Sequence, residues 1–332
     1  MRKLAIESQY AIEVKGLKKT FGKGENKVEA VRGVSLQVKR GEIFGFLGPN
    51  GAGKTTSLRM MVGLLNPSAG NVIILGKDPK EKQNQDFIKE KIGIIPQEVS
   101  LYLELTVEEN LWFIANAYRI PSIEAKVTID KLISDMGLEE KRKALAKNLS
   151  GGMKRRLNLI MGLVHNPELV LCDEPTPGLD PQSRVVVWEY IQNLPKQGKT
   201  VILTTHFMEE ADRLSDRVAI IDNGEILVLD SPKALKKSVG EGDLVEFMLE
   251  NTEEDHLEQI ASALRDFDGG KTIQEVYISS SRVIMRSKDV ISNLSRILNH
   301  IEDHGAEVEN MAIRNTTLED VFISLTGRAL RN

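Results

Sequence analysis

Short apolar runs alternate with stretches of helical periodicity through residues 10–230. The apolar run Ile43–Leu47 is followed at once by glycines, and then by residues 54–65, in which apolar positions recur at helical spacing. Leu169–Cys172 and Thr200–Thr205 are further apolar runs, and each ends in charged or polar residues. This order predicts an α/β domain, in which helices cover a parallel sheet and ligands bind where the strands end.

The middle of the chain carries mostly helical patterns. Thr106–Glu109 is a capping box that opens a helix reaching Tyr118, and a second helix begins near Ser122 and can end at Gly137. We therefore expect a helical insert at about residues 100–165.

Residues 217–222 and 225–229 are strand-like and flank an Asp-Asn-Gly turn. An Asn-Gly pair between two strands is typical of a tight hairpin. We expect this hairpin to close the main domain, with Ser231-Pro232 marking the boundary. The main domain is thus predicted to span residues 10–235.

Beyond Gly240 the pattern predicts strand, helix, strand, strand, helix, strand, the order of a ferredoxin-like unit. These elements are residues 244–249, 255–266, 272–279, 282–286, 290–304 and 307–314. A last helix over residues 317–326 has an apolar stripe that either joins a core or meets a partner. We predict a small α+β domain over residues 241–330.

Composition narrows the class of protein. With 332 residues and 41% hydrophobic content, the chain can fill one large and one small core. Its apolar stretches fall short of the roughly 18 to 20 residues that span a bilayer, and residues 1–10 lack the features of a secretory signal. We therefore expect a cytoplasmic protein. The single cysteine, Cys172, excludes a disulfide framework and leaves oxygen atoms as the metal ligands.

The net charge of −4 conceals an uneven distribution. Residues 1–240 carry 35 lysines and arginines against 30 aspartates and glutamates, whereas residues 241–332 carry 9 against 18. The acidic C-terminal part is either a solvated small domain or a docking face.

Gly48-x4-Gly-Lys-Thr55 matches a phosphate-binding loop and lies between a predicted strand and a predicted helix. Its glycines allow backbone N–H groups to surround phosphate oxygens at the positive end of the helix. Lys54 would reach the β- and γ-phosphates of ATP, and Thr55 would hold Mg²⁺. The predicted nucleotide-binding residues of this segment are Gly48, Pro49, Asn50, Gly51, Ala52, Gly53, Lys54, Thr55 and Thr56.

Asp173 and Glu174 follow the apolar run that ends at Cys172. A nucleotide site of this type needs a carboxylate for magnesium and a group that activates water. We predict that Asp173 faces Mg²⁺, directly or through water, and that Glu174 polarises the attacking water. The alternative is that the pair caps a helix or binds surface lysines.

Leu149-Ser-Gly-Gly-Met153 is a second glycine-rich segment, and it leads into a helix predicted over residues 154–164. It can be an ordinary serine N-cap. Because one phosphate loop already accounts for one nucleotide, a second anion-binding helix end either serves another ligand or completes the site of another subunit.

In motif order, residues 10–235 resemble the nucleotide-binding subunit of an ATP-binding cassette (ABC) transporter. The motifs that carry the resemblance are the phosphate loop, the loop glutamine Gln97, the signature Leu149–Gly152, Asp173-Glu174, the aspartate loop Gly178–Asp180 and the switch histidine His206. Phe21 resembles the aromatic residue that stacks on adenine. Taken singly, Gln97, His206 and Phe21 could be a loop amide, a satisfied strand-end histidine and a core aromatic.

The resemblance implies a P-loop NTPase fold, with ATP and Mg²⁺ as cofactors. It implies catalytic roles for Glu174, His206, Gln97 and Lys54, and metal ligation by Thr55, Gln97 and Asp173. It further implies a head-to-tail dimer, of identical or related subunits, in which Ser150, Gly151 and Gly152 of one chain clamp the γ-phosphate of ATP held by Lys54 of the other. Asp180 is likewise implied to be a nucleotide-binding residue.

The resemblance also implies separate integral membrane permease subunits, with this chain peripheral on the inner face of the cell membrane. The sequence Leu149 to Arg156 and the helix from Thr317 to Phe322 are similar to export-type subunits of the drug-resistance and nodulation groups. One departure is Met153, where the superfamily often has glutamine, so that side chain's hydrogen bond is absent.

Two other functions fit an ABC cassette. A soluble ABC ATPase acting on nucleic acid or ribosomes is disfavoured by the single cassette and by the lack of a basic stripe with interleaved aromatics. An importer ATPase with a regulatory tail predicts an all-β C-terminal domain, whereas residues 255–266 and 290–304 are helical in pattern. We therefore predict an exporter subunit and expect no nucleic-acid partner.

Overall fold

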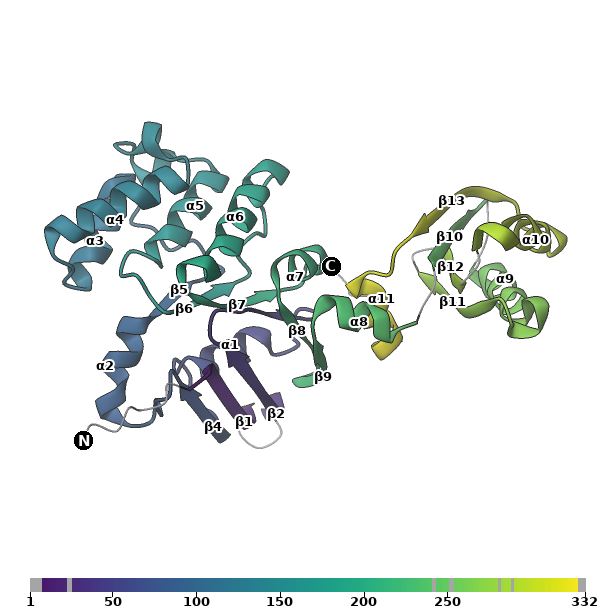
Figure 1. The fold of residues 1–332 in the computed structure, drawn as a ribbon, viewed down its shortest axis with the longest axis horizontal. Helices are drawn as coiled ribbons and strands as arrows, with labels where there is room; N and C mark the ends of the chain where they lie inside the picture. The colour runs from purple at the N-terminus through teal and green to yellow at the C-terminus, as the bar shows by residue number, and fades with distance from the viewer. Residues whose placement is uncertain are drawn as a thin grey trace. The chain divides into compact units, whose positions relative to one another are not determined.

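The structure is a computed structural model that describes residues 8–22, 26–240, 243–250, 254–279, 282–287 and 290–327. The chain forms two compact units that divide at Pro232 (Figure 1). No helix among these residues is both long enough and apolar enough to cross a membrane.

The first unit is built on a six-stranded sheet in the order β5-β6-β7-β3-β8-β9. Its strands are β3 Ile43–Leu47, β5 Ile92–Ile95, β6 Leu169–Asp173, β7 Thr200–Thr205, β8 Arg217–Asp222 and β9 Glu225–Asp230. The first five strands of that order are parallel, and β9 pairs antiparallel with β8. The predicted parallel sheet and the predicted hairpin are confirmed, and the hairpin turn has positive φ at Asn223 and Gly224.

A separate three-stranded antiparallel sheet, in the order β2-β1-β4, holds the early part of the chain. Its strands are β1 Tyr10–Phe21, β2 Val28–Lys39 and β4 Ala69–Ile74. The prediction of one parallel sheet from residue 10 onward is wrong here. In β2, Val34, Leu36 and Val38 are buried and the residues between them are exposed, which is the alternation of a sheet with one buried face.

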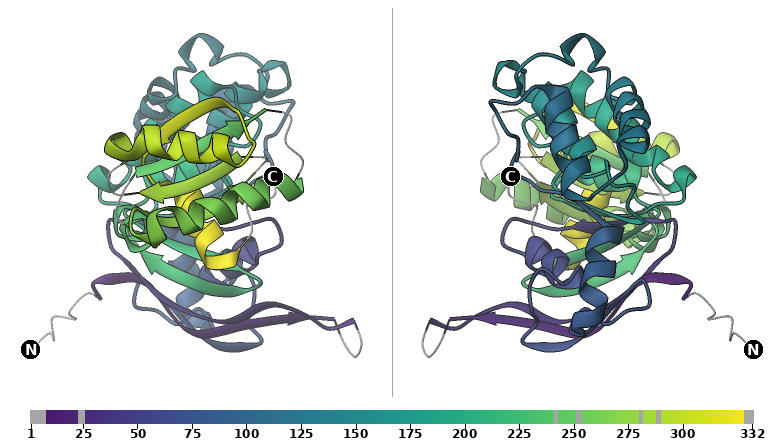
Figure 2. Two further views of the ribbon diagram at one scale, coloured as in Figure 1. Left: turned by 90° about the vertical axis from the view of Figure 1, so that its right-hand side faces the viewer. Right: turned by 90° about the vertical axis from the view of Figure 1, so that its left-hand side faces the viewer.

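Helices cover both faces of the six-stranded sheet (Figures 1 and 2). The helices of this unit are α1 Lys54–Met61, α2 Lys82–Lys91, α3 Val107–Ala117, α4 Ser122–Asp135, α5 Gly151–Met161, α6 Pro181–Asn193 and α7 Met208–Leu214. Helix α1 contacts strands of both sheets, and one core fills the space around it. A second core packs the opposite face of the sheet against α5, α6 and the helical insert formed by α3 and α4.

Three predicted helix boundaries can be compared with the structure. Thr106 caps α3 through the predicted capping box. Helix α1 ends at Met61 rather than at residue 65, because Gly63 adopts a left-handed φ of 75°. Helix α5 begins at Gly151 rather than at residue 154, because Ser150 accepts a hydrogen bond from the Met153 N–H and so caps the helix earlier.

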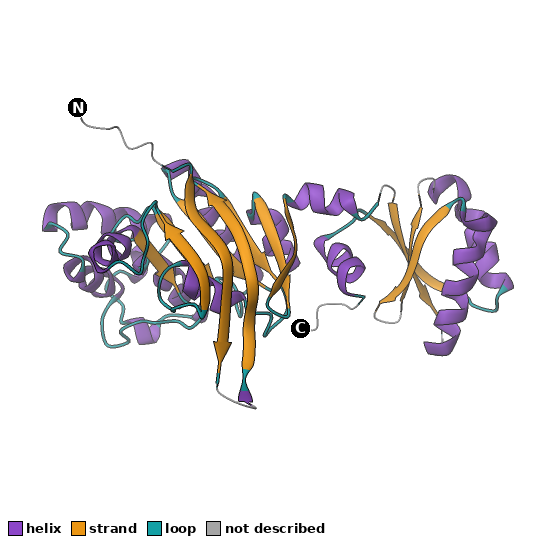
Figure 3. Ribbon diagram, turned by 90° about the horizontal axis from the view of Figure 1, so that it is seen from below, coloured by secondary structure: helices purple, strands orange, loops and turns teal. Residues whose placement is uncertain are grey.

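The second unit contains a four-stranded antiparallel sheet in the order β11-β12-β10-β13. Its elements are α8 Pro232–Ser238, β10 Asp243–Leu249, α9 Glu254–Asp266, β11 Ile273–Ser279, β12 Arg282–Ser287, α10 Val290–Asp303, β13 Val308–Arg314 and α11 Leu318–Thr326. From β10 to β13 the order is the predicted βαββαβ. Helices α9 and α10 cover one face of the sheet (Figure 3) and form the core with it.

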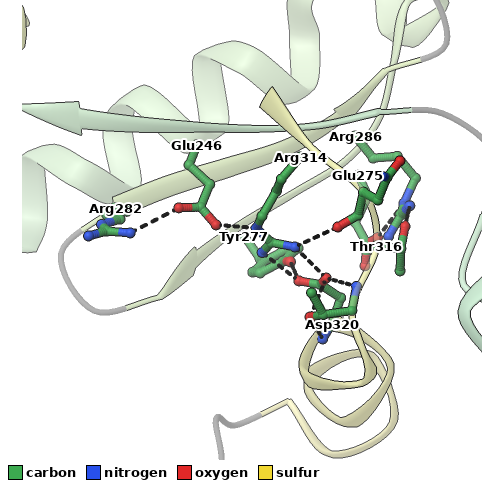
Figure 4. Close-up of polar contacts among 10 residues, drawn as sticks. Glu246, Glu275, Tyr277, Arg282, Arg286, Arg314, Thr316 and Asp320 are labelled. Atoms are coloured by element: carbon green, nitrogen blue, oxygen red, sulfur yellow. Dashed lines mark hydrogen bonds and ion pairs between the residues drawn. The ribbon is translucent and has the colours of Figure 1, made fainter. Parts of the chain in front are cut away.

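A polar network joins the other face of this sheet to the first turn of α11 (Figure 4). Asp320 is buried and accepts two hydrogen bonds from the guanidinium of Arg314, at 2.6 and 2.9 Å, and one from the Tyr277 hydroxyl at 2.6 Å. Its carboxylate also caps the helix by accepting the Thr317 N–H at 2.7 Å. Burial alone would raise the pKa of Asp320, but these hydrogen bonds outweigh burial and lower the pKa to about 2.

We predict that Asp320→Asn lowers the free energy of unfolding of the second unit by about 2 kcal/mol at pH 7, because one charge-assisted acceptor of Arg314 is lost. Urea denaturation followed by circular dichroism measures this loss. Because the folded pKa of Asp320 is depressed, its stabilisation is complete above the unfolded pKa of about 3.9 and is lost as the pH falls toward 2.

The difference in the free energy of unfolding between wild type and Asp320→Asn should therefore shrink between about pH 4 and pH 2. Glu319→Gln is the matched control, since Glu319 is exposed in the same helical turn. A difference that stays constant down to pH 2 would contradict the assignment of Asp320 as the stabilising carboxylate.

Candidate functional site

The phosphate-binding loop joins β3 to α1. Gly53 is the N-cap of α1 and has a φ of 96°, so the first N–H groups of the helix, which have no partner inside it, open onto the loop. The turn of the β8–β9 hairpin supports the loop, because the Gly224 N–H donates to the Ala52 carbonyl at 3.0 Å. Gly224 in turn accepts the N–H of Arg32 at 2.9 Å. The loop is thus supported by the β8–β9 hairpin, and that hairpin is in turn held by β2.

Lys54 is buried and folds back over the loop. Its Nζ donates to the carbonyls of Gly48 at 2.8 Å and Pro49 at 3.1 Å, and it lies 3.5 Å from Glu174 Oε1. Burial lowers the pKa of Lys54, whereas the negative charge of Glu174 favours the protonated form. The ammonium group is thereby fixed between the loop and the end of β6.

Asp173 ends β6 and faces two hydroxyl groups. Its Oδ1 accepts from Thr55 Oγ1 at 3.0 Å and from Thr204 Oγ1 at 2.5 Å. Among the described residues there is no group of three or more His, Cys, Asp or Glu side chains able to hold a metal. One carboxylate beside a threonine hydroxyl nevertheless fits Mg²⁺, which takes one or two carboxylates and completes its shell with phosphate and water oxygens.

Both carboxylate oxygens of Glu174 have side-chain partners. Gln97 Nε2 donates to its Oε2 at 2.9 Å, and His206 Nδ1 lies 3.2 Å from its Oε1. Its backbone has a φ of 45°, a left-handed conformation that costs about 1–3 kcal/mol for a residue with a side chain. The N–H of Glu174 donates to both the carbonyl and the hydroxyl of Thr204, each at 3.1 Å, which holds this conformation.

Arg155 is a buried residue of this site that sequence reasoning missed. It lies on α5, and among the described residues its guanidinium donates only to backbone carbonyls, which include those of Gln97 and Glu174. Burial lowers the pKa of Arg155, and the nearby acidic groups oppose that effect. The sequence did contain a signal for Arg155. It is an arginine on the buried side of the helix, one turn after Gly151.

Glu210 is a second buried residue that sequence reasoning missed. It lies on α7, and its Oε1 accepts from Thr176 Oγ1 at 2.7 Å and from Trp188 Nε1 at 2.9 Å. Burial raises the pKa of Glu210. The carboxylate therefore joins the segment that follows Glu174 to helices α6 and α7.

The signature residues form a separate group at the start of α5. Ser150 and Gly151 are exposed, and Ser150 caps α5. Asp180 caps the neighbouring α6 by accepting the Ser183 N–H at 2.9 Å, and hydrogen bonds from Ser183 lower the pKa of Asp180. A Cβ placed on Gly152 would lie 2.5 Å from Ser183 Oγ and 3.5 Å from Asp180 Oδ2, so the two helix ends lie side by side.

Phe21 ends β1 and is 43% exposed, with Lys19 Nζ 5.2 Å from its ring centre. The alternative reading of Phe21 as a core aromatic is therefore wrong.

The predicted residues thus fall into two groups. Side-chain contacts bring together the residues predicted for phosphate, metal and water: Lys54, Thr55, Gln97, Asp173, Glu174 and His206. A second group, at the exposed ends of α5 and α6, consists of Ser150, Gly151, Gly152 and Asp180. The hydrogen bonds of Ser150 and Asp180 stay within their own helices.

Known proteins are similar in sequence to this chain over nearly its whole length. Residues 31–177 match the family described as ABC transporter. The chain is 36% identical to the linearmycin resistance ATP-binding protein LnrL of Bacillus subtilis (strain 168), over 97% of this chain and 100% of that protein. It is 37% identical to the Nod factor export ATP-binding protein I of Rhizobium sp. (strain N33), over 97% and 99% respectively.

Solved structures resemble a smaller share of the chain. CbiO1 from Clostridium perfringens, described as part of the ABC transporter complex cbiONQ, has a TM-score of 0.63 at 27% identity and covers 70% of this chain and 94% of that one. The ATP-binding cassette MJ0796, described as a dimer in a post-hydrolysis state bound to ADP and Pi, has a TM-score of 0.60 at 28% identity and covers 66% and 98%.

A phosphate loop between a parallel strand and a helix, facing a strand-end aspartate and glutamate, defines a P-loop ATPase of the ATP-binding cassette type. The chain belongs to the ATP-binding subunits of ABC transporters. It is therefore a nucleotide-binding ATPase subunit of a transporter.

We predict that Gly53→Ala destabilises the first unit more than Gly51→Ala. Both glycines have positive φ, so an added Cβ strains the backbone by about 1 kcal/mol at either position. At Gly53 the Cβ would also lie 2.4 Å from the Ala30 carbonyl oxygen, whereas at Gly51 nothing lies within 4 Å. We expect losses of about 3 and about 1 kcal/mol in urea denaturation. Equal losses would contradict the close packing of the loop against β2.

Proposed function

We propose that this chain energises export across the cell membrane as one of two ATPase subunits bound to separate permease subunits. The two groups of predicted residues carry the proposal. Lys54, Asp173 and Glu174 are buried together, whereas the anion-binding start of α5 is exposed, as a surface offered to another chain's nucleotide would be. Two chains arranged head to tail would complete two ATP sites, each with Ser150–Gly152 and Asp180 from the partner.

In this proposal the residues around Glu174 divide the work of hydrolysis. Glu174 polarises the attacking water, while Gln97 and His206 orient its two oxygens. Lys54 neutralises the β- and γ-phosphates. Thr55, Asp173 and Gln97 would hold Mg²⁺, which would supply positive charge that offsets the negative charge of the phosphates.

Coupling to transport would follow from closure of the dimer. A ligand shifts a conformational equilibrium only by its difference in affinity for the two states. The γ-phosphate would be contacted by the signature residues of the partner in the closed dimer, so ATP favours closure more than ADP does. Hydrolysis then releases the closed state. Phe21 is proposed to stack on the adenine without taking part in this switch.

A groove beside Gln97 suits the permease. It encloses about 550 Å³ and is lined by Ile94, Pro96, Leu101, Tyr102, Ile114 and Tyr118, among others. The rings of Tyr102 and Phe113 contact each other with their centres 4.3 Å apart and their planes tilted by 51°, and both residues are almost half exposed. A partner segment bound here would touch the loop that carries Gln97, which would link the permease to the ATP site.

The second unit supports the proposal of export. The relatives named for resistance and for Nod factor export align over 97% of this chain and so include that unit, whereas the solved cassettes cover 66–70% of it. We therefore propose an ATPase domain over residues 10–235, a small acidic domain over residues 241–330, and a location on the cytoplasmic face of the membrane. The transported molecule would be recognised by the permease.

We predict that Glu174→Gln lowers ATP turnover by at least about a hundredfold, because the amide cannot polarise water. Phosphate release from the purified full chain measures turnover. The variant should still bind ATP and form an ATP-dependent dimer, detected by light scattering after size exclusion. Lys54→Ala is the companion variant and should lose ATP binding as well. Turnover of Glu174→Gln near the wild-type value would show that another residue activates the water.

We predict that Phe113→Asp reduces recovery of the tagged chain with membrane protein by at least about tenfold, because it places a charge beside the groove. The ATPase activity of the isolated chain should stay within about twofold of wild type. Ile123→Asp is the control, since Ile123 is 83% exposed on α4, outside the residues that line the groove. Co-purification of the wild-type chain with ribosomes or nucleic acid instead of membranes would contradict the proposal that the chain is an exporter subunit.

A further inference from the structure

Arg155 has an unusual set of partners for a buried arginine. The residue is 3% exposed, and each of its three guanidinium nitrogens donates to backbone carbonyl oxygens rather than to a carboxylate. A buried cation is unfavourable unless hydrogen bonds compensate it. The position therefore requires five donors in a fixed plane, which only arginine supplies.

One edge of the guanidinium holds the loop that carries Gln97. Nη1 donates to the Pro96 carbonyl at 2.9 Å and to the Gln97 carbonyl at 2.7 Å. Asn158, one turn further along α5, reinforces this contact: its Nδ2 lies 3.4 Å from the Pro96 carbonyl, and its Oδ1 accepts the Ser100 N–H at 3.0 Å. Helix α5 therefore fixes residues 96–100 from two successive turns.

The other edge holds the backbone around Glu174. Nε donates to the Pro175 carbonyl at 2.6 Å, and Nη2 donates to the carbonyls of Asp173, at 3.5 Å, and of Glu174. Glu174 is the residue whose backbone lies in the left-handed region. Its N–H is held by Thr204 and its carbonyl by Arg155, so the direction of its side chain depends on both.

We propose that Arg155 is a positioning residue that sets Glu174 and Gln97 of its own chain according to the position of α5. The inference rests on the proposed function, in which the start of α5 contacts the nucleotide of the partner chain. Ser150 and Arg155 lie within two turns of one rigid helix. A displacement of α5 by the nucleotide at one site would therefore move the carbonyls that aim the water-activating carboxylate at the other site.

Two simpler roles would also place an arginine here. Arg155 could stabilise the core without influence on catalysis, or it could shape the signature segment for the nucleotide of the partner. The three roles differ in measurable ways. A core role affects folding, a signature role affects the site completed by the partner, and the proposed role affects the site that contains Glu174 of the same chain.

The first test compares Arg155→Lys with Arg156→Lys in the purified full chain. Lysine keeps the charge but cannot reach carbonyls on both sides with a planar fork. Arg156 is the matched control, because it is the next residue of α5 and donates to the Met136 carbonyl at 2.9 Å, away from Glu174. We expect Arg155→Lys to lower kcat by about tenfold to a hundredfold and to change KM for ATP by less than about twofold.

Arg156→Lys should keep kcat within about twofold of wild type. Thermal melting of both variants checks folding, and Arg155→Gln, which keeps an amide donor, replaces Arg155→Lys if that variant does not fold. Equal kcat for the two lysine variants, or a loss confined to KM, would overturn the proposal.

The second test uses mixed dimers in which Glu174→Gln silences one chosen site. In the first dimer, Arg155→Lys is on the chain that keeps Glu174, and kcat should fall by the same factor as in the Arg155→Lys homodimer. In the second dimer, Arg155→Lys is on the Glu174→Gln chain, and turnover should equal that of a dimer carrying Glu174→Gln alone. The reverse result would assign Arg155 to the signature segment and overturn the proposal.

The two tests separate this inference from the proposed function. If wild type hydrolyses ATP and Glu174→Gln abolishes turnover, the proposed role of Glu174 stands whatever Arg155→Lys does. If a dimer of wild-type and Glu174→Gln chains does not form with ATP, the head-to-tail site and the transmission between sites are both overturned. The comparison of Arg155→Lys with Arg156→Lys then still decides whether Arg155 positions Glu174.

Discussion

The site depends on holding the backbone of one residue, Glu174, in an unfavourable conformation just after β6. Glu174 has a positive φ, and this turns its carboxylate toward Lys54, Gln97 and His206. A backbone of this kind persists only when its surroundings over-determine it. Here the neighbouring strand, through Thr204, and helix α5, through Arg155, both bind the same backbone.

The two cores of the first unit explain why those supports stay in place. Every residue of strands β3, β6 and β7 is buried, and the two cores pack on both faces of these strands, which fixes where their carboxyl ends meet. Asp173 ends β6, whereas Lys54 and His206 follow β3 and β7, and the three residues converge because these strands are parallel. The functional site thus lies at the edge of the sheet where the strands have their carboxyl ends and where loops from distant parts of the chain come together.

The sequence was most informative where local chemistry determines structure. Apolar strands, the Asn-Gly turn and the capping box at Thr106 were all predictable, as were the residues around Glu174 once the motifs were seen in order. The antiparallel sheet containing β2 was missed because its exposed positions dilute the apolar signal. Arg155 was missed because its partners are carbonyl oxygens, which every residue has and no sequence pattern records.

The hairpin turn under the phosphate loop has a consequence for biosynthesis. Ala52 accepts a backbone hydrogen bond from Gly224, and Gly224 accepts one from Arg32. The phosphate loop is synthesised before the hairpin, so it lacks this support until the hairpin emerges from the ribosome. A nascent chain that ends after His206 contains the nucleotide-binding motifs named above, but it lacks the hairpin turn whose Gly224 donates a hydrogen bond to Ala52. The support of the phosphate loop is therefore completed only after the segment that follows the switch histidine has been synthesised.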